Sequence, residues 1–227
     1  IEDGRIYLAY ERPAGTMLSS HIGSTGPLSV AQSVDVFGKI IDALEEAKRF
    51  GIWHRDISPS NVTLTPDGRD LKLLHFGLAE PSGGAAFGDP WFLSPEQARG
   101  EPVNEQTTIY SLGTLWYYSV CGTPVFPDAD PAVVLQKHQS EGPQIPTVRR
   151  PDLELPAGFD NLIARALVKS APGRFSSLGE MLAAGRALVA AAAQPAPVAP
   201  APAPVAPAPA PAPVAPPPAA SDLGAAA

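Results

Sequence analysis

Several features that would indicate a compartment or a partner are scarce or missing in this chain. Its single cysteine, Cys121, excludes an internal disulfide and favours a reducing compartment, so we expect a cytoplasmic location. No apolar run reaches the roughly 18 residues that a membrane-spanning helix needs, so no membrane segment is expected. The net charge of -7 is spread along the chain without a basic stripe, which argues against nucleic acid as a partner.

Charged and aromatic residues are absent from residues 194–220, where the sequence is almost only Pro, Ala and Val. Such a segment has no side chains with which to build a core, so it is expected to be extended and polyproline-like. We therefore expect a folded domain at 1–193 and a disordered or polyproline tail at 194–227. The tail could recruit a polyproline-binding module, but without basic or aromatic residues it is better interpreted as a spacer, with a tethered anchor possible beyond it.

Apolar spacing in the first 193 residues predicts a mainly helical domain with a few short strands. Ser29 is placed to cap a helix that runs to about residue 50, because apolar residues recur there every three or four positions. Short apolar runs predict strands at 5–11, 61–64 and 71–74. Further helices are expected at 108–120, 130–140, 159–168 and 176–193.

The densest group of polar residues lies in the loop Ile52–Asn61, directly after the first of these helices. This loop holds His54, Arg55, Asp56 and Asn61 within eight residues, and an apolar run follows it. An acid, a base and an amide held beside a core are suited to charged chemistry. Simpler alternatives are that Asp56 caps a turn and that His54 is a packed core histidine.

Six motifs follow one another along the chain: His54-Arg55-Asp56, Asn61, Phe76-Gly77-Leu78-Ala79, Ser94-Pro95-Glu96, Tyr110-Ser111-Leu112-Gly113 and Arg174-Phe175. Their order resembles the C-terminal lobe of bacterial Hanks-type serine/threonine protein kinases. The resemblance covers about residues 4–190 and implies a kinase-like α+β lobe that is mainly α, with the N-terminal lobe largely absent. Small-molecule phosphotransferases share the His-x-Asp-x-x-x-x-Asn loop, but the Ser-Pro-Glu-Gln and Gly-Arg-Phe-Ser elements resemble protein kinases.

The resemblance implies a role for each matching residue. Asp56 matches the residue that accepts the hydroxyl proton of a protein substrate, and Asn61 matches a ligand of magnesium, which prefers oxygen. Glu96 and Arg174 match a buried structural ion pair. The implied cofactors are ATP and Mg²⁺. Matches to the adenine site are Tyr10, Glu11, Arg12 and Thr63, and the other structural matches are His54, Arg55, Phe76, Gly77 and Thr108.

Four positions depart from the family pattern. His75 replaces the magnesium-binding Asp of Asp-Phe-Gly, and Ser58 replaces the Lys that steadies the transferred phosphate. Asp89 replaces a Thr and adds negative charge beside Asp56, while Thr108 replaces a buried Asp that anchors the loop. Imidazole nitrogen is a poor substitute for an anionic oxygen on magnesium, and a hydroxyl carries no positive charge. Catalysis is expected to be weak or absent.

No Gly-x-Gly-x-x-Gly motif occurs in the chain, and the sequence begins at Ile1 without a signal peptide, so we expect it to be a piece of a longer product. Two hypotheses follow. The favoured one is a pseudokinase or truncated kinase that acts as a signalling scaffold for a protein partner and needs no cofactor. The alternative is an active kinase that transfers the γ-phosphate of ATP to a protein substrate when an upstream lobe is present.

Overall fold

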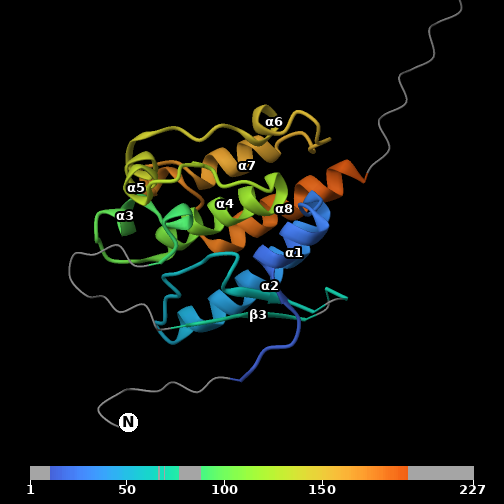
Figure 1. Cartoon of the computed structure of the whole chain (residues 1–227), viewed down its shortest axis with the longest axis horizontal. Coiled ribbons are helices and arrows are strands. Elements are labelled where there is room, and N and C mark those ends of the chain that lie inside the picture. Colours follow the sequence, from blue (N-terminus) through green and yellow to red (C-terminus); the bar gives the residue numbers. More distant parts are fainter. Residues whose placement is uncertain (1–10, 66, 69, 77–87, 194–227) are drawn as a thin grey trace, which may run out of the picture. The chain divides into compact units, whose positions relative to one another are not determined.

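A computed structural model describes residues 11–65, 67–68, 70–76 and 88–193 of the chain. Helices make up most of this part, and short strands lie together on one side of it (Figure 1). The elements are β1 Thr16–Met17, α1 Leu18–Thr25, α2 Val30–Arg49, β2 Val62–Leu64, β3 Leu71–Leu73, η1 Pro90–Phe92, α3 Pro95–Ala98, α4 Glu105–Cys121, α5 Pro131–Ser140, α6 Pro146–Arg149, α7 Phe159–Ala166, η2 Ala171–Gly173 and α8 Leu178–Ala192.

Helix α4 is the centre of the core. It is buried along nearly its whole length, and α2, α7 and α8 all pack against it (Figure 1). Trp116 of α4 stacks on Phe37 of α2 with ring centroids 4.5 Å apart, and its Nε1 donates to Ser33 Oγ at 2.8 Å. A Cβ added at Gly185 of α8 would lie 2.6 Å from Trp116, so only glycine allows α8 to approach this closely. Large side chains on α4 and a small one on α8 therefore fix the helix packing.

The main helices predicted from apolar spacing are confirmed, with differences at their ends. Helix α2 begins where Ser29 forms a capping box with Gln32. Helix α4 begins at Glu105 rather than at residue 108, because Asn104 accepts a hydrogen bond from the Thr107 amide and caps it. Helix α8 begins at residue 178 and not 176, because Ser177 occupies its N-cap.

The small sheet is antiparallel, with strand order β1-β2-β3. The predicted strands at 61–64 and 71–74 are confirmed as β2 and β3, whereas β1 and α1 were not predicted. The strand predicted at 5–11 falls almost entirely outside the described residues and stays a prediction. Strand β2 begins directly after the loop Ile52–Asn61 and pairs with β3. This pairing fixes the position of the last residue of the loop.

Glu96 of α3 and Arg174 form a buried ion pair, as the resemblance implies. Two hydrogen bonds of 2.7 and 3.1 Å join the carboxylate to the guanidinium, whose side chain is 0 % exposed. The remaining donors of Arg174 reach the backbone oxygens of Val168, Gln106 and Lys169 at 2.7 to 2.9 Å. All five N–H groups of Arg174 thus have acceptors, which is what a buried guanidinium requires.

Replacing Arg174 with Met should therefore lower the free energy of unfolding by about 3–5 kcal/mol, because a charged Glu96 would remain buried alone. Urea unfolding followed by tryptophan fluorescence measures this change. The matched control is Arg99→Met, which breaks the ion pair between Arg99 and Glu101. The side chain of Arg99 is 40 % exposed and that of Glu101 is 47 % exposed. That variant should lose less than about 1 kcal/mol, and equal losses in the two variants would contradict a structural role for Glu96–Arg174.

Candidate active site

His54 ties the polar loop to the end of β3. Its Nε2 donates to the Leu74 carbonyl at 2.6 Å, its Nδ1 accepts the Asp56 amide at 3.3 Å, and its ring meets the edge of Phe76 with centroids 4.6 Å apart. The side chain is fully buried, and this burial lowers the pKa of His54. A neutral ring with its proton on Nε2 satisfies both contacts, so His54 orients the backbone that carries Asp56.

Gln97 holds the next residue of the loop, and sequence reasoning missed it. Its Nε2 donates to the carbonyl of Arg55 at 2.6 Å, and its Oε1 accepts from the Ser111 hydroxyl at 3.2 Å. Arg55 has a φ of 67°, which is unusual for a residue other than glycine. Ser94 and Gln97 form a capping box at α3, and this Ser-x-x-Gln pattern was the available signal. Gln97 thus joins α3, α4 and the polar loop.

Asp56, Asn61 and His75 are joined by direct hydrogen bonds. Asn61 Nδ2 donates at 2.8 Å both to Asp56 Oδ2 and to the Asp56 backbone carbonyl. The other end of the same amide, Asn61 Oδ1, accepts from His75 Nδ1 at 2.8 Å. His75 has a φ of 66° and follows directly after Leu74, the residue that His54 contacts. Three residues that the resemblance assigns to catalysis or metal binding therefore contact one another.

Asp89 lies on the other side of Asp56. Its backbone amide donates to Asp56 Oδ1 at 3.1 Å, and its own carboxylate accepts from the Trp91 amide at 3.1 Å and caps η1. Burial raises the pKa of Asp89, and the charge of Asp56 adds to this effect. A Cβ at Gly88 would lie 2.9 Å from Asp56 Oδ1, so glycine is needed for this close approach. The backbone of Asp89 thus contacts Asp56, and the two carboxyl groups are close enough for the charge of one to act on the other.

Ser58 and Thr108 are both buried. They supply neither the cation nor the carboxylate that the family pattern has at these two positions. Ser58 is 2 % exposed and carries no charge. The Thr108 hydroxyl donates to the Asn104 carbonyl of its own helix at 3.0 Å. On the α4 side, the polar loop is instead held through Ser111 and Gln97.

The residues matched to an adenine site are only partly described. Tyr10 lies outside the described residues, as does Gly77 of the structural set. Thr63 is buried in β2, where its hydroxyl donates to the Lys72 carbonyl at 3.4 Å. Glu11 pairs with Lys72 Nζ at 2.5 Å, and Arg12 is exposed. Their roles in nucleotide binding stay predictions.

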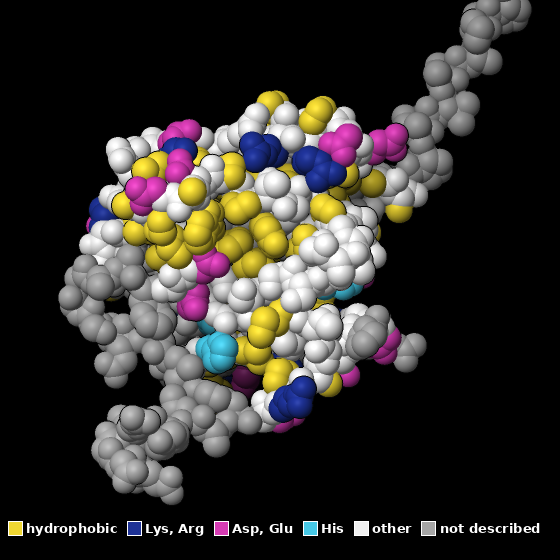
Figure 2. All heavy atoms as spheres, viewed as in Figure 1, with side chains coloured by type: hydrophobic (Ala, Val, Ile, Leu, Met, Phe, Trp, Pro, Cys, Tyr) yellow, Lys and Arg dark blue, Asp and Glu magenta, His cyan; other side chains and the backbone are white. Residues whose placement is uncertain are grey.

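Acidic and histidine side chains are visible at the edge of a broad apolar area in the space-filling view (Figure 2).

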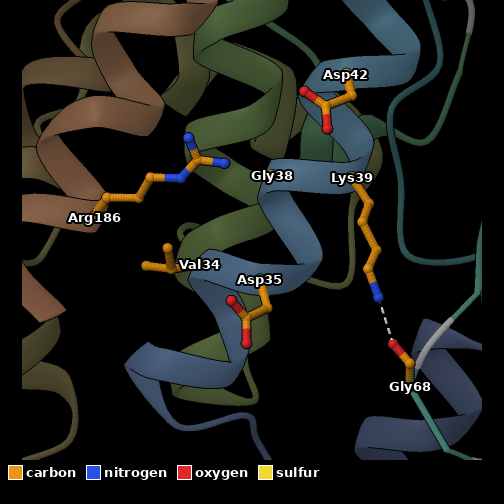
Figure 3. A pocket seen from close by; sticks show the side chains of 7 residues that line it. All are labelled: Val34, Asp35, Gly38, Lys39, Asp42, Gly68 and Arg186. Atoms are coloured by element: carbon orange, nitrogen blue, oxygen red, sulfur yellow. Dashed lines mark hydrogen bonds between the residues drawn. The ribbon is translucent and has the colours of Figure 1, made fainter.

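A hollow of about 330 Å³ lies between α2 and α8, away from the candidate site. Carboxylates and cations both face this hollow, and Lys39 Nζ donates to the Gly68 carbonyl at 2.5 Å (Figure 3). No residue of the loop Ile52–Asn61 lines it, so it is not part of the candidate site. Its lining is Val34, Asp35, Gly38, Lys39, Asp42, Gly68 and Arg186.

Comparison with known proteins agrees with the motifs. Residues 1–183 match the protein kinase domain family, so this chain belongs to that family. It is 32% identical over 191 residues to the serine/threonine-protein kinase pkn3 of Myxococcus xanthus, covering 78% of this chain and 35% of that protein. It is 31% identical over 186 residues to PknB of Mycobacterium tuberculosis, covering 78% and 29%. The chain thus spans about a third of the length of these relatives.

The fold of a solved kinase structure is also similar. The kinase domain of PknI from Mycobacterium tuberculosis has a TM-score of 0.61 and 24% identity, with 79% of this chain and 64% of that chain covered. The predicted family, bacterial Hanks-type serine/threonine kinases, and the predicted kinase-like, mainly α fold class are confirmed. Whether the C-terminal lobe stands alone, the boundary at residue 193 and the individual site roles stay predictions. Among the described residues, no helix is both long and apolar enough to span a membrane.

The kinase family in general uses ATP with Mg²⁺, and the residues described here do not fit that metal. Magnesium requires oxygen ligands in near-octahedral geometry. The oxygen that Asn61 could offer already accepts a hydrogen bond from His75, and the position of the second metal ligand holds an imidazole. Over the described ranges, no group of three His, Cys, Asp or Glu side chains is arranged to hold a metal ion.

The buried histidines predict a pH dependence of stability. The pKa values of His54 and His138 are lowered in the folded state, to about 3 for His138, while an unfolded His titrates near 6.5. As the pH falls below about 6.5, the unfolded state takes up protons that the folded state does not. The free energy of unfolding should therefore fall between pH 7 and pH 5, by about 2 kcal/mol from His138 alone.

Urea unfolding at a series of pH values measures this dependence. Asp89 acts in the opposite direction, because its pKa is raised and the folded state gains a proton first as the pH falls towards it. The sharper comparison is therefore the difference between the protein and its His138→Phe variant. A variant as sensitive to pH as the unsubstituted protein would contradict the prediction.

Proposed function

We propose that this protein kinase-family domain acts as a signalling scaffold that binds a protein partner and does not transfer phosphate. The observation that carries the proposal is the hydrogen bond of 2.8 Å from His75 Nδ1 to Asn61 Oδ1. His75 and Asn61 stand at the two positions where the family pattern has ligands of magnesium. Here a hydrogen bond joins the two side chains to each other.

Charge around Asp56 supports the same proposal. Asp56 accepts from the neutral N–H groups of Asn61 and Asp89, and Asp89 brings a second carboxyl group close to it. Phosphoryl transfer depends mainly on positioning and on neutralising the charge of the transferred group. Ser58 cannot supply the cation that the family has at its position. Losing one such stabilising group typically lowers the rate by about a hundred- to a thousand-fold.

An active kinase remains the alternative, and specific contacts favour it. Asp56 and Asn61 are both present, and His54 and Gln97 hold the loop backbone at its base. The relatives carry the name of serine/threonine-protein kinases. In this alternative Asp56 accepts the hydroxyl proton of a protein substrate, and ATP is bound with the help of residues encoded upstream. The Pro/Ala-rich residues 194–227 serve as a spacer in either case.

A labelling experiment separates the two functions. The full reading frame that contains this chain is expressed and incubated with Mg²⁺ and ATP labelled on the γ-phosphate, alone and with a generic basic protein. Incorporation should not exceed that of the Asp56→Ala variant, because the charges needed in the transition state are missing. Labelling that is clear in the unsubstituted protein and lost in Asp56→Ala would overturn the scaffold proposal.

A second experiment tests the cause. The double variant His75→Asp with Ser58→Lys restores the carboxylate and the cation of the family pattern, so it should gain a rise in melting temperature with Mg²⁺ and ATP. The control is the single variant Ser58→Lys, in which His75 still donates its hydrogen bond to Asn61 Oδ1. Magnesium and ATP should not raise the melting temperature of this variant. The same rise in the double variant and in the control would show that the His75–Asn61 contact is not the obstacle.

A further inference from the structure

A buried polar chain connects α4 and α5 away from the loop Ile52–Asn61. Tyr110 of α4 is completely buried, and its hydroxyl oxygen accepts from Lys169 Nζ at 2.9 Å. The same hydroxyl lies 3.0 Å from Nδ1 of His138 on α5, which is also completely buried. The cation of Lys169 lies 4.8 Å from the centre of the Phe126 ring, and that ring meets His138 edge-on at 5.0 Å. Neither the family motifs nor the proposed function accounts for this arrangement.

The contacts fix the protonation of each member of the chain. Lys169 can only donate, so the Tyr110 oxygen accepts and its own proton is directed to His138 Nδ1. A neutral His138 that accepts at Nδ1 carries its proton on Nε2. Burial is the largest cause that lowers the pKa of His138, and the charge of Lys169 adds to it, so the neutral ring is the stable form.

His138 lies on α5, the helix that packs on the turn η1. Among the described residues, its buried Nε2 atom has no hydrogen-bond partner within normal distance. The backbone of Trp91 and Pro90 nevertheless favours a proton on the His138 ring, and α5 packs directly on η1. A buried donor that lacks a short hydrogen bond usually makes a weak or water-bridged contact instead.

The turn η1 is also the element that positions Asp89. The Trp91 amide donates to the Asp89 carboxylate, and the Asp89 amide donates to Asp56 Oδ1. Helix α4 also packs against η1. A shift of η1 would therefore move Asp89 away from Asp56.

We propose that His138 is a positioning residue, whose Nε2–H holds the turn η1 so that the Asp89 amide stays on Asp56. Tyr110 and Lys169 keep the ring in the one tautomer that can do this. The inference concerns geometry and stands whether or not the domain transfers phosphate.

Amide hydrogen exchange of the full chain, measured at Asp89 and Trp91, tests the proposal. His138→Phe keeps a ring but removes both nitrogens, so exchange at these two amides should rise at least about tenfold, while amides of α2 and α8 change little. His138→Gln restores a donor at the Nε2 position and should recover protection. His138→Asn restores only a group near the Nδ1 position and should not recover protection. Unchanged exchange in His138→Phe, or equal recovery by Asn and Gln, would overturn the proposal.

Two tyrosines on α4 provide a matched control. Tyr117 is as buried as Tyr110, but its hydroxyl has no hydrogen-bond partner in the described part of the chain. Tyr110→Phe removes the donor to His138 Nδ1 and should raise exchange at Asp89 and Trp91. Tyr117→Phe removes a hydroxyl that takes no part in the polar chain and should leave both amides unchanged. Equal effects of the two substitutions would show that the polar chain does not position η1.

Discussion

A polar group buried in a protein core is costly without a partner, and the guanidinium of Arg174 is the strictest case beside α4. It offers five donors inside a core, and Glu96 together with three backbone carbonyls accepts all of them. These acceptors come from α3, from the start of α4 and from the segment after α7, so satisfying one side chain fixes three parts of the fold at once. The position of α3 in turn sets Gln97, and Gln97 sets the backbone of Arg55. The geometry of the polar loop therefore depends on an ion pair that takes no part in its chemistry.

The same requirement is met differently at Asp56. Its carboxylate is surrounded by N–H groups of an amide side chain and of the backbone, and the amide is held at its other end by His75. These partners satisfy hydrogen bonding but bring no positive charge. A loop of this kind can keep its shape without a bound cation, whereas a site built for phosphoryl transfer uses a metal to complete its coordination. The residues that hold the family fold, such as Glu96 and Arg174, therefore differ from those that depart from the family pattern, such as Ser58 and His75.

Local signals allowed most of the fold to be predicted, and tertiary contacts account for the rest. Helix α2 follows from the Ser29 cap and its apolar spacing, and α4 from an almost continuous apolar run. Helix α1 was missed because its sequence is rich in Ser, Thr and Gly, and packing of its few apolar residues holds it in place. At the site, motif order was enough to predict Asp56 and Asn61. The contacts His75–Asn61 and Gln97–Arg55 join residues 14 and 42 positions apart, and no local pattern encodes such distances.

The close packing of α2 and α8 affects how the domain forms during synthesis. Gly185 of α8 lets the helix reach Trp116 and Val34, which belong to the part of the core that α2 and α4 share. These two helices are the first long helix and the last helix of the described chain, so the ribosome releases α2 long before α8 exists to cover it. Contacts between distant segments form late and leave apolar surface exposed in the meantime. A nascent chain that ends before α8 would hold an uncovered apolar groove, which is the kind of surface that chaperones bind.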